Sequence, residues 1–163
     1  MMRLRVSAVI LCATAFAACG SVSDSVDFHA PPNFVSKASL GPLMQIWQSN
    51  DSRSVLIVMK IPGEIDIDKA MNSADIKSAK PISRKNITIC NGQRAVLSEM
   101  VGTTGGNVKL GIGAGESSSE NSKIDFMLTH AGGDSYMAMY AWPIHNPPDR
   151  AAQAALRGLC AKK

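Results

Sequence analysis

The sequence predicts an α+β domain: an antiparallel β-sheet built from hairpins, with a mid-chain helix and a C-terminal helix packed on it. Several short segments alternate apolar and polar residues, as half-buried strands do. Glycine-containing turns separate two pairs of these segments, and apolar residues recur at helical spacing near the C-terminus. The chain has 163 residues, 45% of them hydrophobic, which suffices for one domain with a core but not for two.

Residues 1–18 are predicted to be a lipoprotein-type signal peptide. Arg3 and Arg5 precede an apolar run that ends in small residues, which is the pattern of an export signal. The segment Phe16-Ala17-Ala18-Cys19-Gly20 resembles the bacterial lipobox. The resemblance implies that Cys19 becomes the first mature residue and carries the lipid, palmitate included. Phe16 stands where lipoboxes usually have Leu, so cleavage after Ala17 or Ala18 by an ordinary signal peptidase remains the alternative.

The polar residues after Cys19 predict a lipidated tether over 19–27, followed by a single domain over 28–163. Three acyl chains, as in the lipoproteins that this segment resembles, exceed the two signals needed for stable anchoring. We therefore expect the N-terminal lipid to hold the protein on a membrane, with the protein facing the periplasm. By the same resemblance, Gly20 in place of Asp after the cysteine favours the outer membrane over the inner.

The first half of the domain predicts strands and one helix. Two prolines, Pro31 and Pro32, separate short extended pieces because proline fixes a turn. The alternation over 44–48 predicts a half-buried strand, and the apolar run within 54–61 predicts a strand covered on both faces. Helical spacing over 64–79 predicts an amphipathic helix, which Pro81 closes.

Two hairpins are predicted in the second half. Asn91-Gly92 lies between extended segments at 87–90 and 94–101, and this dipeptide favours a type I′ turn. Gly132-Gly133-Asp134 reverses the chain between strands at 124–128 and 136–142. The Gly- and Ser-rich stretch over 102–122 predicts a mobile loop.

A helix is predicted after Asp149, whose carboxylate is placed to cap it. Its apolar stripe ends at Leu159 and Cys160, so the last cysteine is expected to face the sheet. If the signal removes Cys12 and the lipid consumes Cys19, then Cys90 and Cys160 remain as an even pair in an oxidising compartment. We therefore predict a Cys90–Cys160 disulfide that joins helix to sheet, with two buried free thiols as the alternative.

This order of elements resembles the small PsbP/Mog1-like domains of some exported bacterial lipoproteins. The resemblance covers residues 28–160 and rests on four features: the prolines at Pro31-Pro32, the apolar strand run, the turn Ile87-Thr88-Ile89-Cys90-Asn91-Gly92-Gln93 and the closing 149–160 helix. A final aromatic strand over 136–142, ending in Pro143, adds to it. It implies an antiparallel sheet with helices on its faces and a non-catalytic adaptor or assembly role, without a catalytic motif to carry over.

The last predicted strand offers the candidate binding face. Tyr136, Tyr140 and Trp142 share one side of it and methionines occupy the other, because side chains alternate along a strand. Trp47 is predicted to extend the aromatic side. The face either forms an apolar surface for a partner or lies under a helix.

Other chemistry finds little support in the sequence. The three histidines lack ligand spacing, so no metal or other cofactor is expected, and no nucleophile elbow is present. Two of the 17 basic residues lie in the predicted signal peptide, and the charge of the others is largely balanced by 13 acidic residues. The sequence therefore has no basic stripe that could bind nucleic acid.

The sequence thus favours a lipid-anchored, non-enzymatic envelope protein that binds a protein partner or a small apolar ligand. The alternative is an envelope enzyme whose site assembles from dispersed groups such as His130, His145 and Asp134. Convergence of those groups in one cleft would favour the enzyme.

Overall fold

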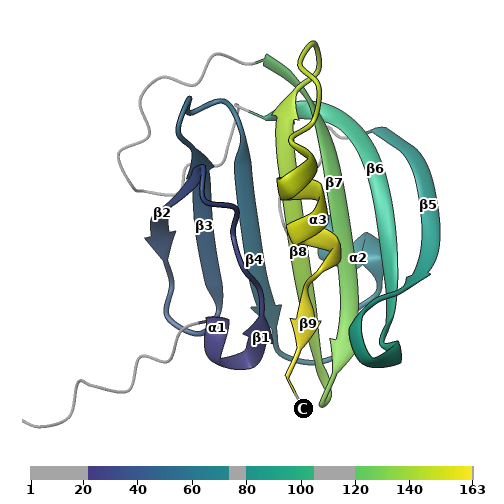
Figure 1. Cartoon of the computed structure of the whole chain (residues 1–163). Coiled ribbons are helices and arrows are strands. Elements are labelled where there is room, and N and C mark those ends of the chain that lie inside the picture. Colours follow the sequence, from purple (N-terminus) through teal and green to yellow (C-terminus); the bar gives the residue numbers. More distant parts are fainter. Residues whose placement is uncertain (1–21, 74–79, 105–119, 163) are drawn as a thin grey trace, which may run out of the picture.

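A computed structural model describes residues 22–73, 80–104 and 120–162 of the chain. These residues form strands with short helices between them (Figure 1). The elements are, in chain order, α1 Val22–Ser25, β1 Val26–Asp27, β2 Phe34–Ser39, β3 Met44–Ser49, β4 Val55–Ile61, α2 Ile67–Ser73, β5 Lys80–Thr88, the 3₁₀-helix η1 Cys90–Gly92, β6 Arg94–Thr104, β7 Glu120–Ala131, β8 Asp134–Pro143, α3 Arg150–Arg157 and β9 Cys160–Ala161.

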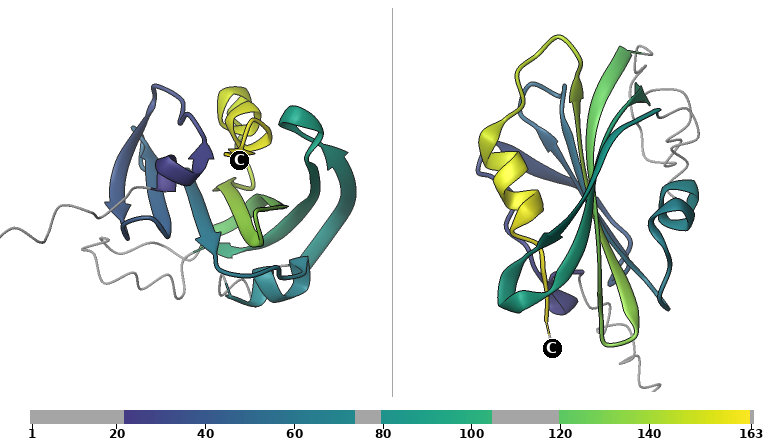
Figure 2. Two further views of the ribbon diagram at one scale, coloured as in Figure 1. Left: turned by 90° about the horizontal axis from the view of Figure 1, so that it is seen from below. Right: turned by 90° about the vertical axis from the view of Figure 1, so that its right-hand side faces the viewer.

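The main sheet has seven strands in the order β2-β3-β4-β8-β7-β6-β5, and every pair is antiparallel. The late strand β8 lies at its centre, between β4 and β7. A separate ribbon joins β1 to β9. Helices α3 and α2 cover opposite faces of the sheet, and the side with β5 and β6 curls towards α3 (Figure 2). This is the predicted α+β architecture.

Two cores lie on the two faces of the sheet, and β8 contributes to both because its side chains alternate. Tyr136, Tyr140 and Trp142 belong to the α3 face, where Leu56, Phe34 and Leu156 also pack. The α2 face is rich in methionine, a side chain that fills irregular gaps. Its methionines are Met44, Met59, Met71, Met100, Met137 and Met139.

The hairpin between β7 and β8 follows the prediction. Its turn has Gly132 and Gly133 at the two central positions, both with positive φ, 61° and 81°. Positive φ at both positions defines the type I′ turn, whose twist matches that of the strands.

The turn between β5 and β6 differs from the predicted type I′ turn. Gly92 has a positive φ of 75° but Asn91 does not, and residues Cys90–Gly92 form a 3₁₀ turn. Two backbone hydrogen bonds close the loop, from the Ile89 N–H to the Gln93 carbonyl and from the Gln93 N–H to the Cys90 carbonyl. Because the loop is longer, Cys90 is not paired between β5 and β6, and its side chain can reach β9.

Three predicted boundaries shift. The helix expected over 64–79 occupies Ile67–Ser73, and residues 74–79 lie outside the described residues. The extended segment expected from Ile87 begins earlier, because strand β5 starts at Lys80 and includes Pro81. The loop expected over 102–122 is shortened at both ends, because β6 continues to Thr104 and β7 begins at Glu120; residues 105–119 lie outside the described part.

The C-terminal helix forms as predicted. Asp149 is its N-cap, and its carboxylate accepts hydrogen bonds from the amides of Ala151 (2.8 Å) and Ala152 (3.2 Å). Ala152 and Leu156 are buried against the sheet. The helix ends at Arg157, so Cys160 lies in β9 and not on the helical stripe where it was expected.

The described fold begins earlier than the predicted boundary at Phe28. Val22 and Val26 are each only 1% exposed and belong to the α3-face core. They bury because the four-residue helix α1 and strand β1 place them on the same side of the chain. Residues 22–27 therefore belong to the folded body, and the rest of the expected tether lies outside the described residues.

Candidate functional site

The predicted disulfide between Cys90 and Cys160 is present. The two Cα atoms are 5.7 Å apart, within the range for a disulfide. The bond connects the β5–β6 turn to β9, and the Gln93 side chain supports it by donating to the Ala161 carbonyl at 2.9 Å. It therefore fastens the C-terminal end of the chain to one edge of the sheet. Cys19, the predicted lipidation site, lies outside the described residues.

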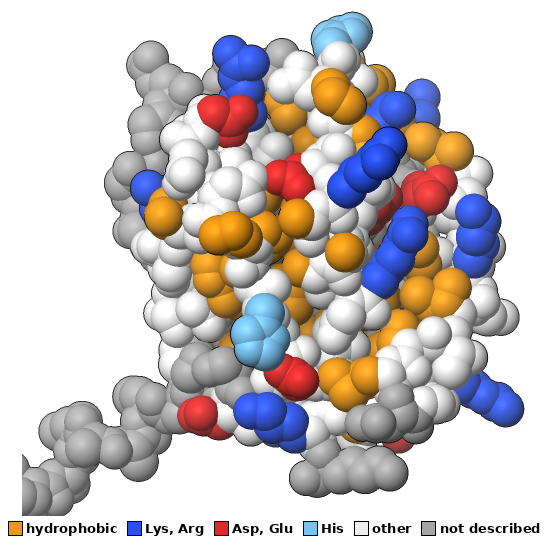
Figure 3. Space-filling model, viewed as in Figure 1, with side chains coloured by type: hydrophobic (Ala, Val, Ile, Leu, Met, Phe, Trp, Pro, Cys, Tyr) orange, Lys and Arg blue, Asp and Glu red, His pale blue; other side chains and the backbone are white. Residues whose placement is uncertain are grey.

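The predicted aromatic binding face is wrong for the three residues of β8. Tyr136, Tyr140 and Trp142 are only 4%, 1% and 5% exposed. Helix α3 packs on β8, and the three rings belong to the core on that face, which corresponds to the alternative that the sequence left open. Trp47 is half-buried and packs against Phe28, with 5.1 Å between ring centroids. On the face seen in Figure 3, hydrophobic side chains form small groups among polar and charged ones.

The dispersed groups of the alternative enzyme do not converge. Asp134 points to the α3 side of the sheet and pairs with Lys60 at 2.8 Å, and this ion pair lowers the pKa of the Asp134 carboxyl. His130 lines a groove on the α2 side. His145 is exposed beyond Pro143, at the end of β8 opposite the β7–β8 turn. The three side chains thus form no common cleft.

A serine–histidine contact occurs on the α2 side, but it is structural. The Nδ1 atom of His130 lies 3.0 Å from Ser135 Oγ. Ser135 is fully buried; its hydroxyl donates to the Gly63 carbonyl (2.7 Å) and accepts from the Ile65 amide (2.9 Å). Because the only hydroxyl proton goes to Gly63, His130 must donate from Nδ1, which leaves Nε2 as an acceptor when the ring is neutral. Ser135 therefore holds the β4–α2 connection and is not poised as a nucleophile.

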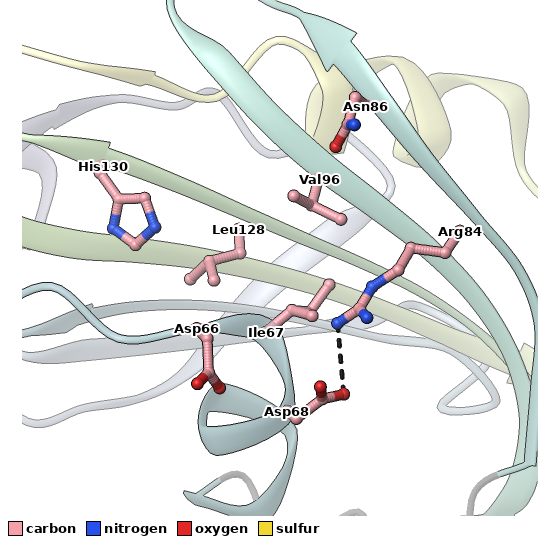
Figure 4. A pocket seen from close by; sticks show the side chains of 8 residues that line it. All are labelled: Asp66, Ile67, Asp68, Arg84, Asn86, Val96, Leu128 and His130. Carbon is pink, nitrogen blue, oxygen red and sulfur yellow. Dashed lines mark hydrogen bonds and ion pairs between the residues drawn. The ribbon is translucent and has the colours of Figure 1, made fainter.

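A groove of about 410 Å³ lies between α2 and strands β5, β6 and β7, and we call it the α2 groove. Val96 and Leu128 form its apolar floor, with His130 at one end and Arg84 at the other (Figure 4). Strand alternation puts these side chains on one face, because Asn86 pairs with Val96 and Val96 with Leu128. The complete lining is Asp66, Ile67, Asp68, Arg84, Asn86, Val96, Leu128 and His130.

The charged rim of the α2 groove is only loosely paired. Arg84 contacts Asp68 at 3.2 Å, and the two side chains are 47% and 76% exposed. Exposed ion pairs of this kind contribute little, about 0–1 kcal/mol, so the guanidinium remains available to a stronger acceptor. Asp66 is engaged as the cap of α2, since its carboxylate accepts from the Lys69 amide at 2.7 Å. The groove can therefore hold an apolar group on its floor and an acidic group at Arg84.

A second polar feature lies under α3. Asp125 on β7 is 3% exposed and accepts a hydrogen bond from Gln153 Nε2 at 2.9 Å. Burial raises the pKa of the Asp125 carboxyl; the neighbouring Glu99 adds to this, whereas the Gln153 hydrogen bond and Arg157 oppose it. The carboxylate is enclosed by the helix and opens into no groove among the described residues, so we assign it to the fold.

Sequence reasoning missed most of the α2 groove. Arg84 and Asn86 escaped notice because the segment before Ile87 was not recognised as a strand. Their spacing of two residues was the available signal, since it places both side chains on one face of a strand. Val96 and Leu128 belong to predicted strands, but only the pairing of β6 with β7 makes them neighbours.

Two further observations bear on function. No three His, Cys, Asp or Glu side chains within the described ranges gather as the ligands of a metal ion would. None of the helices in those ranges has the length and apolar character needed to cross a bilayer.

Comparison with known proteins finds similarity of fold alone. No family model matches the chain, and no curated protein matches its sequence. A crystal structure from Bacteroides thetaiotaomicron is similar with a TM-score of 0.53 and 10% identity, over 85% of this chain and 45% of that one. This chain thus spans less than half the length of the Bacteroides protein.

Two other similar structures are the Ran-binding protein Mog1p of Saccharomyces cerevisiae and PsbP of the cyanobacterium Synechocystis. Mog1p has a TM-score of 0.48 and 11% identity, over 80% of this chain and 77% of Mog1p. PsbP has a TM-score of 0.47 and 14% identity, over 83% of this chain and 87% of PsbP. The similar structures thus include both proteins that give the expected PsbP/Mog1-like fold its name, and at these identities the likeness says nothing about function.

Proposed function

We propose that this protein is a lipid-anchored binding protein of the bacterial envelope and that its ligand occupies the α2 groove. The groove is the observation that carries the binding role. Its volume of about 410 Å³ lies in the range of small-molecule sites, and it combines an apolar floor with a few polar groups, as such sites do. The ligand it suits is a small molecule or partner side chain with an apolar body and an acidic end.

The position of Arg84 argues for the acidic end. Its guanidinium has five N–H donors, and the one hydrogen bond described for it is the exposed contact with Asp68 at 3.2 Å. A carboxylate or sulfonate arriving at the rim would accept a bidentate pair from the same fork. The apolar body would then lie along Val96 and Leu128 towards His130, whose Nε2 offers an acceptor at the far end.

The envelope location rests on the sequence and agrees with the disulfide. The Cys90–Cys160 bond is typical of compartments that keep thiols oxidised. With those two cysteines paired and Cys12 in the signal, Cys19 is the remaining thiol, and it follows Phe16-Ala17-Ala18. Lipidation of Cys19 would leave the mature chain without a free thiol, which suits an exported protein.

Binding is tested with the fluorescent anion 8-anilinonaphthalene-1-sulfonate, whose aromatic body and sulfonate match the proposed ligand. We expect Arg84→Glu to weaken its binding at least about tenfold, through the loss of charged hydrogen bonds. Lys85→Glu is the matched control, because it makes the same charge change on the neighbouring residue of β5, which points to the other face. Equal affinities of the two variants, measured by fluorescence titration with thermal melts to verify folding, would reject the groove as the site.

The anchor is tested by labelling cells with an alkyne analogue of palmitate. We expect the wild-type protein to incorporate the label and Cys19→Ser to lose it while it is still exported. Label that persists in Cys19→Ser, or that is absent from both proteins, contradicts the anchor. The groove assay does not depend on this result.

A further inference from the structure

Several elements meet at one end of the sheet, which we call the basal end. The β2–β3 turn, residues 40–43, lies there beside the last residues of β4, because the Lys60 amide donates to the Leu43 carbonyl at 2.8 Å. Helix α1, where the described chain begins, and the ribbon of β1 and β9 lie at the same end (Figures 1 and 2). The Lys162 amide, which follows β9, donates to the carbonyl of Ser25 in α1 at 2.9 Å.

The β2–β3 turn presents two exposed leucines at the basal end. Leu40 is 54% exposed and Leu43 48%, whereas most large apolar side chains of the described residues are buried. The turn is ordered by its own backbone, since the Leu43 amide donates to the Leu40 carbonyl (3.1 Å) and the Leu40 amide to the Met44 carbonyl (2.8 Å). Gly41 takes the positive φ of 52° that the turn needs. The leucines are thus held outward by a defined turn.

Covalent geometry places this end near the proposed lipid. Val22 is 1% exposed and fixed in the core, and only Gly20 and Ser21 separate it from Cys19. Three residues of chain span at most about 11 Å even when fully extended. A lipid on Cys19 therefore keeps Val22, at the start of α1, within about that distance of the attachment point and places the basal end on the side of the molecule that carries the anchor.

We propose that the basal end rests on the bilayer and that Leu40 and Leu43 insert into its interfacial region. The proposal rests on the lipid anchor of the proposed function and adds an orientation to it. Apolar side chains beside a lipid anchor gain by entering the boundary between headgroups and acyl chains. The α2 groove lies on a face of the sheet, with its His130 end nearest the basal end and its Arg84 end farther along the strands.

The charges at the basal end indicate that the contact is apolar. Lys60 is neutralised by Asp134 at 2.8 Å. The exposed Lys162 lies at the same end as the exposed carboxylates of Asp24 and Asp27. Charges of both signs are therefore present, without the cluster of cations that anionic lipids attract. Insertion of the two leucines should therefore vary little with salt or with the fraction of anionic lipid.

The test uses the full chain, exported and lipidated, with a nitrobenzoxadiazole fluorophore on an introduced cysteine. Because Cys19 carries the lipid and Cys90 pairs with Cys160, the new thiol is the only reactive one. Leu40→Cys and Leu43→Cys place the probe on the turn. Ile82→Cys is the matched control, an exposed apolar residue (62%) on β5, towards the opposite end of the sheet. The proteins are mixed with vesicles of phosphatidylethanolamine and phosphatidylglycerol.

We expect the probes at positions 40 and 43 to shift to shorter wavelength and to be quenched by lipids brominated on the acyl chain, while the probe at 82 does neither. Equal behaviour at all three positions, in protein that floats with the vesicles, overturns the orientation but leaves the anchor intact. Protein that does not float contradicts the anchor itself and therefore the proposal. Two separate turn positions guard against local disturbance by one substitution, and thermal melts verify folding.

Discussion

Asp125 is a residue whose ionisation opposes folding. It is 3% exposed, and burial raises its pKa above that of an unfolded aspartate, with Glu99 adding to the effect. A raised folded-state pKa contributes stability that is complete below the unfolded pKa and is lost as the pH rises through the folded value. The neutral Asn side chain would keep the volume and a hydrogen bond with Gln153 without the charge.

We therefore expect Asp125→Asn to increase the free energy of unfolding at pH 7, with the gain shrinking to nothing below about pH 4. Urea unfolding at a series of pH values measures it. The same change at the exposed Asp27 provides the surface background. A loss of stability at pH 7 would mean that the carboxylate is needed, as a ligand or partner group, beyond its role in the fold.

Asp149 has the opposite effect on stability. Burial alone would raise its pKa, but hydrogen bonds from the Asn33 side chain (2.7 Å) and from the amides of Ala152 and Ala151 outweigh burial and lower it. We expect Asp149→Ala to cost about 1 kcal/mol, the usual loss of an N-cap. Because a lowered pKa contributes stability that disappears as the pH falls through the folded value, wild type and variant should converge in acid.

Asp149→Asn is the informative control at this position. It keeps a capping oxygen, so most of the stability should remain, whereas the pH dependence should be lost. Urea titrations of all three proteins at pH 7 and in acid give the comparison. If Asp149→Asn is as unstable as Asp149→Ala at pH 7, the charge matters more than the cap.

At the scale of elements, the disulfide fastens β9 to the turn between β5 and β6. It closes a loop of 70 residues, and the chain-entropy model gives about 4 kcal/mol for a loop of that length. We expect Cys90→Ser/Cys160→Ser to lose about that much stability in denaturant titrations. Reductant should destabilise the wild type by a similar amount and leave the double variant unchanged, and an effect on the variant would point to another cause.

The turns of the two predicted hairpins show how far a local sequence signal determines turn geometry. Gly132-Gly133 closes the predicted hairpin in a type I′ turn because both glycines accept positive φ without a steric penalty. Asn91-Gly92 does not, because the loop is longer and Cys90 is bonded to β9. A long-range covalent bond thus accompanies a turn geometry that the dipeptide alone does not favour.

At the scale of the whole molecule, stability should decrease from the centre of the sheet to its edges. Strand β8 lies between β4 and β7 with α3 and α2 on its two sides, whereas β5 is an edge strand with mostly exposed residues. Amide hydrogen exchange reports local opening. We expect the slowest exchange in β7 and β8 and the fastest, among the main strands, in β2 and β5, and protection in β5 equal to that in β8 would contradict this order.

The arrangement of the whole sheet also explains why the candidate site was not predicted. The α2 groove combines residues from α2, β5, β6 and β7, and its floor exists only because β6 pairs with β7. The rings of β8, which the sequence singled out, are buried in the core on the α3 face. A strand pattern shows that two faces differ but not which of them a helix covers, because that depends on where the C-terminal helix returns.

The sequence alone determined the strands at 44–48 and 54–61, the Gly-Gly hairpin, the alternation along β8 and the capped C-terminal helix. Each of these depends on a periodicity or on turn and cap chemistry within a few residues, which the chain carries locally. Only the tertiary structure decided that α3 buries the aromatic face, that 80–88 is an edge strand, that Val22 belongs to the core and that a groove opens beside α2. Those outcomes depend on contacts between residues far apart in the chain, and packing across the whole sheet selects them.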